Sequence, residues 1–238
     1  MSWIAEPMVG FDLETTGTDV ETDRVVTAAM VKVERGGTLL EERTWLLDPG
    51  IPIPKQASSV HGISTDHART HGSQAATAIG EIAHAVAEVL RSGTPLVVMN
   101  ARYDLTLLDR ECLRNEVDSV SERLKKIPDP VIDPMVLDKH VDKSRRGRRT
   151  LQALCAHYGV RLDNAHNASA DAVAAVRVAR CIGEKYTFLG EMVPADMNVL
   201  QMKAAVEQSA SLQEYLRRSS NPTAVVESAW PIIPRQAK

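Results

Sequence analysis

The stretch M-V-G-F-D-L-E-T-T-G-T-D, residues 8 to 19, begins with an apolar run and ends in a cluster of turn-forming residues. Such a run is typical of a buried β-strand, which we expect over Met8 to Leu13. Side chains on a strand alternate between its two faces. Asp12 and Glu14 are therefore expected on one face, and Phe11 and Leu13 on the other.

Two acids on one strand face predict either a cation site or an exposed strand end. Neighbouring carboxylates repel each other, and in a buried strand their charge is costly unless a cation neutralises it. Carboxylate oxygens are hard ligands that suit Mg²⁺ or Mn²⁺. The alternative is that the strand emerges into solvent just before its turn, in which case Asp12 and Glu14 need no cation.

The segments that follow predict an α/β fold. Two further strands are expected at Val25–Glu34 and Arg43–Leu47, and Gly36-Gly37 between them suits an antiparallel hairpin. A helix is expected up to Leu90, with Ser73 as its N-cap. Strands and helices then alternate, with strands at Thr94–Asn100 and Val131–Asp133 and helices at Arg102–Asn115, Pro134–Val141, Leu151–Tyr158 and Ala168–Phe188. This order predicts a mixed sheet flanked by helices.

The last part of the chain is predicted to extend this fold. Gly190 and Pro194 interrupt the pattern, and an amphipathic segment from about Asp196 to Arg218 predicts one more helix. We therefore expect a main domain at residues 1–189 and a C-terminal helix and tail at residues 190–238. The tail is expected to lie over the surface or to be partly disordered.

Composition limits the class of protein. With 238 residues and 44% hydrophobic content, the chain can bury one sizeable core. It has 28 basic and 31 acidic residues, a net charge of -3, so any contact with nucleic acid must be local. No signal peptide or membrane span is evident, and no disulfide framework is formed by the three cysteines, Cys112, Cys155 and Cys181. A cytoplasmic protein is the expectation.

Two more acids and one histidine lie near predicted helix starts. Asp104 follows the predicted strand at Thr94–Asn100, at a position where open-sheet proteins commonly bind ligands. Asp171 lies near the start of the Ala168–Phe188 helix, and His166 precedes it in H-N-A-S-A-D. Each acid alone is also explained as a carboxylate favoured by the helix dipole, and His166 as a surface loop residue.

Three motifs, taken together and in order, carry a family resemblance. They are F-D-L-E-T-T-G-T-D at residues 11–19, N-A-R-Y-D-L-T-L-L at residues 100–108 and H-N-A-S-A-D-A at residues 166–172. Further matches are V-H-G-I at residues 60–63, I-D-P at residues 132–134 and L-Q-A-L-C-A-H-Y-G from residue 151. Over roughly its first three-quarters the chain resembles the DnaQ-like, or DEDDh, 3′-to-5′ exonuclease family, which includes the proofreading epsilon subunit of bacterial DNA polymerase III.

The resemblance implies a ribonuclease H-like fold in which these motifs converge on one site. It implies that His166 is the general base, and that two Mg²⁺ or Mn²⁺ ions are held by the carboxylates of Asp12, Glu14, Asp104 and Asp171. It also implies that the substrate is bordered by Leu13, Thr15, His61, Asn100 and Tyr103. Tyr103 is otherwise explained by helix packing, and V-H-G-I by a turn that needs Gly62.

The densest positive cluster is K-S-R-R-G-R-R, from Lys143 to Arg149. It is a candidate loop for following the phosphates of a nucleic-acid strand. The alternative is a solvated, mobile run of charge.

The resemblance implies a two-metal exonuclease that releases nucleoside monophosphates from DNA 3′ ends. Single-stranded or frayed ends would be preferred, in repair or proofreading. One alternative is an exoribonuclease that trims RNA or oligoribonucleotides, since nothing visibly recognises a 2′-hydroxyl. Another is a non-catalytic, polymerase-associated binding module, although the complete set of acids and His166 argues against it. The expected partners are single-stranded DNA and, through the C-terminal helix, a DNA polymerase or a second copy of the chain, with no membrane.

Overall fold

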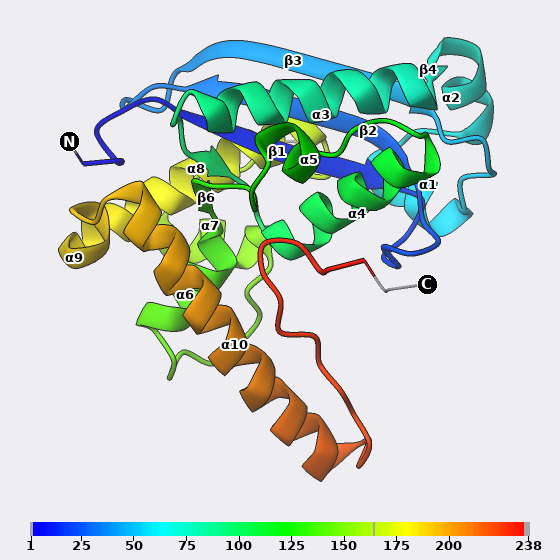
Figure 1. Ribbon diagram of the computed structural model, residues 1–238. Coiled ribbons are helices and arrows are strands. Elements are labelled where there is room, and N and C mark those ends of the chain that lie inside the picture. The colour runs from blue at the N-terminus through cyan, green and yellow to red at the C-terminus, as the bar shows by residue number, and fades with distance from the viewer. Residues whose placement is uncertain (1, 164, 236–238) are drawn as a thin grey trace.

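A six-stranded mixed sheet forms the centre of the molecule (Figure 1). The computed structural model describes residues 2–163 and 165–235. The strand order is β4-β3-β2-β1-β5-β6, and the bounds are β1 Met8–Thr15, β2 Val25–Val33, β3 Leu39–Asp48, β4 Ser73–Gln74, β5 Leu96–Val97 and β6 Val131–Ile132. The first three strands pair antiparallel, whereas β5 pairs parallel to β1 and β6 parallel to β5. The predicted mixed α/β sheet is confirmed.

Helices cover both faces of this sheet. On one face lie α3 (Ala75–Arg91), α4 (Ala101–Arg114) and α5 (Val120–Leu124), which share an apolar cluster with Val9, Phe11 and Leu13 of β1. On the other face α8 (Ala168–Lys185) shares a second apolar cluster with Met8. Side-chain alternation on β1 therefore directs Asp12 and Glu14 to the face that α8 covers.

Gly10 allows α8 to lie close to β1. A Cβ atom at this position would lie 2.4 Å from the carbonyl oxygen of Ala172 and 2.9 Å from its carbonyl carbon. Any larger side chain would therefore push α8 away from the strand. Because Asp171 immediately precedes Ala172, this close contact also determines how near Asp171 lies to the carboxylates of β1.

The C-terminal segment is more closely integrated than a surface tail. Helix α10 (Pro194–Ser219) packs against β6 and α6 (Pro134–Val141), while its C-terminal half extends away from the sheet (Figure 1). The chain then returns towards α4, and Trp230 is only 4% exposed in the same cluster as Phe11. The remaining helices are α7 (Leu151–Tyr158) and α9 (Thr187–Gly190).

Several local predictions need correction. Ser73 is not the N-cap of α3, because Ser73–Gln74 pairs with the end of β3 as β4, and Gln74 precedes the helix. Strand β3 begins at Leu39, earlier than predicted. Its first residues were missed because they form an exposed, largely polar stretch without an alternating apolar pattern. Three short helices were missed, α1 (Lys55–His61), α2 (Thr65–His71) and α5. Each buries at most one residue, so no apolar periodicity marks them.

Helices of the described segments are too short or too polar to traverse a lipid bilayer. A cytoplasmic location stays a prediction, as does the division of the chain between residues 189 and 190.

Candidate active site

Three carboxylates from two elements meet beyond the middle of β1. Asp12 and Glu14 come from the strand, and Asp171 comes from the first turn of α8. One oxygen from each lies within 4.8 Å of the others, and all three side chains are half-buried. The structure thus brings together residues that are more than 150 positions apart in the sequence.

Asp104 lies beside this cluster. It belongs to the first turn of α4, is 4% exposed, and its Oδ1 accepts a hydrogen bond from the backbone N–H of Leu13 at 3.1 Å. This bond ties the start of α4 to the centre of the first motif. It also gives Leu13, a predicted substrate contact, a defined structural role through its backbone.

The four acids destabilise one another's charged forms. Burial, and then the charges of Asp104, Asp171 and Glu14, raise the pKa of Asp12 well above its ordinary range. Burial, and then the charge of Asp171, raise the pKa of Glu14 to about 7. Burial is also the main cause of the raised pKa values of Asp104 and Asp171. The site therefore gathers carboxylates whose mutual repulsion a bound cation would relieve.

The donor set fits a hard divalent cation. Asp171 Oδ1 is buried and has no hydrogen-bond partner within residues 2–163 and 165–235. A buried carboxylate oxygen without a partner is costly, and a metal ion would satisfy it. Oxygen-only ligands of this kind suit Mg²⁺ or Mn²⁺ better than metals that prefer nitrogen or sulfur.

His166 lies at the rim of the same site. Its side chain is exposed, its backbone has a left-handed φ of 68°, and its N–H donates to Asp171 Oδ2 at 3.2 Å. The His166 charge also acts to lower the pKa of Asp171, against the larger effect of burial. A histidine in this strained conformation is uncommon, and the bond to Asp171 helps to hold it there.

The predicted substrate residues Thr15 and Tyr103 hold the turn that follows β1. The hydroxyl of Tyr103 donates to the carbonyl of Gly17 at 2.5 Å and lies 2.8 Å from Thr15 Oγ1, which donates to the same carbonyl. Burial raises the pKa of Tyr103 to about 12, so the group stays a phenol. Tyr103 also packs against the core, so the helix-packing interpretation applies as well.

His61 lies beside the end of β1, at the C-terminus of α1. Its Nδ1 accepts from the N–H of Ile63 at 3.2 Å, whereas its buried Nε2 has no partner among the described residues. Burial lowers the pKa of His61, and the neighbouring Thr15 backbone partly offsets this. Gly62 has a φ of 79°, which confirms that this motif also needs its glycine for a turn.

Asp133 is a buried support of the site that the sequence marked only through the I-D-P match. Its carboxylate accepts from the N–H groups of Asn100 (3.1 Å) and Ala101 (2.9 Å), and it caps α6. Asn100 itself adopts a left-handed φ of 61° directly before α4. An aspartate placed before a helix-starting proline was the available signal for this role.

The basic cluster divides into two parts. Arg145 and Arg149 both pair with Asp138, which is fully buried, and Arg149 Nε lies 2.8 Å from Asp138 Oδ2. Arg146 and Arg148 are exposed and form no ion pair with any described residue. Two of the four arginines are therefore committed to the fold and cannot follow a strand freely.

With this geometry established, sequence comparison identifies the family. Residues 9–179 match the RNase_T exonuclease family. The chain belongs to this family. The match includes every predicted metal carboxylate and His166, and it confirms the predicted DnaQ-like 3′-to-5′ exonuclease class.

Two relatives with names that refer to DNA polymerase III are longer proteins that this chain matches in part. A DNA polymerase III subunit epsilon-like protein of Rhodobacter capsulatus is 32% identical over 170 residues, which is 70% of this chain and 22% of the relative. A PolC-type DNA polymerase III of Lacticaseibacillus paracasei is 29% identical over 166 residues, 70% of this chain and 10% of the relative. The chain thus spans only a small part of the relatives that it matches.

Solved structures show the same fold at lower identity. E. coli Exonuclease I in complex with a dA16 oligonucleotide superposes with a TM-score of 0.67 and 20% identity, covering 86% of this chain and 47% of that one. Exonuclease I from Methylocaldum szegediense gives a TM-score of 0.66 and 22% identity, covering 86% and 46%. These matches confirm the predicted ribonuclease H-like fold.

Proposed function

We propose that this exonuclease removes nucleotides from the 3′ end of DNA, preferring single-stranded or frayed ends, as part of repair or proofreading. The observation that carries the proposal is the group of three carboxylates whose oxygens lie within 4.8 Å of one another. Asp12, Glu14, Asp104 and Asp171 would hold two Mg²⁺ or Mn²⁺ ions. E. coli Exonuclease I, which has the same fold, was solved with a DNA oligonucleotide, and this supports DNA as the substrate.

The chain's own groups account for the remaining needs of hydrolysis. Bound divalent cations polarise water and neutralise the negative charge that develops on phosphate and on the leaving 3′ oxygen. The four carboxylates would hold these cations in place and would cancel part of their charge. Magnesium polarises water less than zinc does, so a separate base is useful. His166, tethered to Asp171 through its backbone, accepts the proton of the attacking water at its imidazole.

The residues around this centre would receive the 3′ terminus. The turn held by Thr15 and Tyr103 lies on one side, with Leu13 behind it. His61 offers a buried Nε2 that has no hydrogen-bond partner in the described part of the chain and can donate to a phosphate or sugar oxygen. Asn100 precedes the helix that carries Asp104, and its amide side chain completes this set.

Replacement of His166 by asparagine tests the role of the imidazole. Asparagine tolerates the left-handed backbone and keeps the N–H bond to Asp171, but it cannot act as a base. We expect kcat to fall by about 10²- to 10⁴-fold while the melting temperature is unchanged. The matched control is His84→Asn on the exposed side of α3, which should retain full activity. Near-normal turnover by His166→Asn would remove this residue from the mechanism.

The substrate class is tested with end-labelled oligonucleotides. Single-stranded, paired and mismatched DNA and matched RNA are digested with Mg²⁺ or Mn²⁺, with chelator as the negative control. The proposal expects fastest release of mononucleotides from the 3′ end of single-stranded DNA. Faster digestion of RNA would identify an exoribonuclease, and no digestion of any substrate would indicate a binding module. Association with a DNA polymerase or with a second copy stays a prediction, which solution mass can test.

A further inference from the structure

Three hollows that share lining residues lie between α6, the basic cluster (residues 143–149) and α10, and together they are called the groove below. One hollow of about 540 Å³ is lined by Asn100, Lys139, Arg148 and Arg149, together with neighbouring apolar residues. A second of about 580 Å³ shares Lys139 and Arg149 and continues along α10 to Tyr215. Asn100 and Lys139 also line a third, smaller hollow beneath α10. Lys139 is therefore common to all three.

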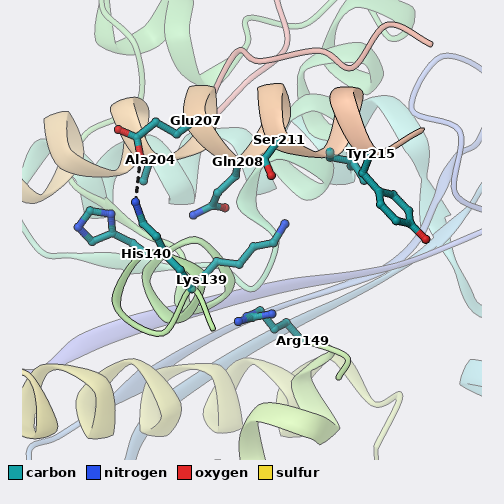
Figure 2. A pocket seen from close by; sticks show the side chains of 10 residues that line it. Lys139, His140, Arg149, Ala204, Glu207, Gln208, Ser211 and Tyr215 are labelled. Atoms are coloured by element: carbon teal, nitrogen blue, oxygen red, sulfur yellow. Dashed lines mark hydrogen bonds and ion pairs between the residues drawn. The ribbon is translucent and has the colours of Figure 1, made fainter. Parts of the chain in front are cut away.

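The groove has cations that the fold does not neutralise. Arg149 is paired with Asp138, and Lys143 Nζ lies 3.3 Å from Glu207 Oε2. Lys139 and Arg148 have no ion pair among the described residues, although both line the groove. Figure 2 shows Lys139 extending into the space between α10 and Arg149.

The potential in this region favours an anion. Lys139 is half-buried, and burial, followed by the charges of Arg149 and Arg102, lowers its pKa. Positive charges that crowd a half-buried lysine make its charged form costly. A phosphate in the groove would relieve that cost and supply the missing partner for Lys139.

The far end of the groove offers groups that suit nucleotide bases. Tyr215 projects from α10 (Figure 2), and 65% of its surface is exposed. Leu212, one turn earlier, is 43% exposed. Exposed aromatic rings beside a basic groove are the usual means of binding unpaired bases without sequence preference. Ser211 and Gln208 on the same wall provide polar contacts.

We propose that this groove binds the part of a single-stranded polynucleotide that lies upstream of its 3′ end. Asn100 connects the groove to the candidate active site, because it lines the groove and lies four residues before Asp104. The wall from Ala204 to Tyr215 covers roughly 16 Å of helix, enough for several stacked nucleotides at about 3.4 Å each. This proposal rests on the proposed function in one respect: the strand lies with its 3′ end at the active site only if the protein degrades DNA from that end. The existence of the groove site does not depend on cleavage.

Binding without turnover provides the test. A 5′-fluorescent oligo(dT) of 16 nucleotides is titrated with the 238-residue protein in EDTA at several salt concentrations, and the anisotropy of the oligonucleotide is measured. Three variants are compared with the native chain: Lys139→Ala with Arg148→Ala, Tyr215→Ala alone, and the control Lys125→Ala with Lys126→Ala, which removes the same charge from the loop after α5. Arg148 and Tyr215 are exposed, so single variants at these positions keep the test valid if the Lys139 variant is unstable.

The expected results separate this groove from general electrostatics. The Lys139/Arg148 variant should bind about tenfold or more weakly, and its slope of log K against log salt should fall by about 1.4, since each phosphate contact contributes roughly 0.7. Tyr215→Ala should weaken binding by about 5- to 100-fold with an unchanged salt slope. The Lys125/Lys126 control should bind like the native chain. Native-like binding by both groove variants, or an equal loss in the control, would overturn the proposal.

A small substrate distinguishes failure of the groove from failure of the active site. The p-nitrophenyl ester of thymidine 5′-phosphate reaches only the metal site, so all variants should hydrolyse it at the native rate with Mn²⁺. Loss of this activity in the groove variants would show that the substitutions act at the active site, and would overturn the proposal that the groove binds the strand. A native chain that hydrolyses nothing, while the oligonucleotide results hold, would refute the proposed function and leave the groove supported.

Discussion

Replacing Glu14 by glutamine should stabilise the metal-free protein while it impairs catalysis. The structure raises the pKa of Glu14 from an ordinary 4.5 to about 7 because the carboxyl is partly buried and faces Asp171. An ionised Glu14 therefore works against folding. Glutamine has nearly the same shape and carries no charge, so the variant removes the unfavourable charge without creating a cavity.

The magnitude follows from the pKa. One pKa unit corresponds to about 1.4 kcal/mol, so ionised Glu14 would cost the metal-free fold roughly 3 kcal/mol well above pH 7. Because the side chain is only half-buried, solvent screening reduces this to about 1–2 kcal/mol. A carboxyl whose pKa is raised on folding imposes no cost below pH 4.5, where it is protonated in both states. The cost grows as pH rises from 4.5 and is complete above about pH 7.

Urea unfolding of the native and Glu14→Gln proteins in EDTA, from pH 5 to pH 8, measures this effect. The variant should be more stable by about 1–2 kcal/mol at pH 8, and the two should converge near pH 5. Adding Mn²⁺ should make the native protein the more stable of the two, because a metal ion that binds only the folded native site stabilises the native fold. A Glu14→Gln protein that is equally or less stable than native at pH 8 in EDTA would refute the reasoning.

Two further substitutions test the packing that positions the site. Gly10→Ala should lower the free energy of unfolding by about 1–3 kcal/mol and reduce activity, because its Cβ would lie 2.4 Å from Ala172 O. The control Gly80→Ala in α3, with its nearest contact at 3.8 Å, should leave stability unchanged or raise it by up to about 1 kcal/mol. Urea unfolding and nuclease assays measure both, and equal stabilities would contradict the close contact. Trp230→Ala should cost about 3–5 kcal/mol, whereas Val225→Ala, 82% exposed in the same tail, should change stability by less than about 0.5 kcal/mol. A melting temperature for Trp230→Ala equal to that of Val225→Ala would mean that the tail does not pack on the core.

The first strand and its acids could be predicted because their pattern is local. An apolar run followed by Asp12, Glu14 and a turn determines both the strand and the face from which the acids project. That Asp171 lies near them was inferred from the family motifs, and its physical cause, the contact of α8 with Gly10, involves a pairing between distant segments. No sequence pattern at Gly10 distinguishes such a contact from an ordinary turn or bulge.

The basic cluster shows that a charge pattern in the sequence does not reveal which arginines are free to bind a nucleic acid. Arg145 and Arg149 look identical to Arg146 and Arg148 in the sequence, yet the first two pair with a buried acid. That acid, Asp138, lies on α6, and nothing in its neighbourhood indicates burial. Similarly, the short helices α1 and α2 bury too few side chains to produce a periodic pattern, so His61 could be placed near the site only through the resemblance.

The hydrogen bonds around Asp133 join parts of the chain that are far apart in sequence. Gln201 of α10 accepts from the Asp133 backbone at 2.7 Å, and Trp230 of the tail donates to its carboxylate at 3.4 Å. The same carboxylate secures the Asn100–Ala101 turn, from which the second motif begins. Shortening the chain after residue 189 would therefore expose this aspartate to water and loosen the turn that aims Asp104. Anyone who trims this protein to its family-matched segment should expect a weakened catalyst as well as a smaller one.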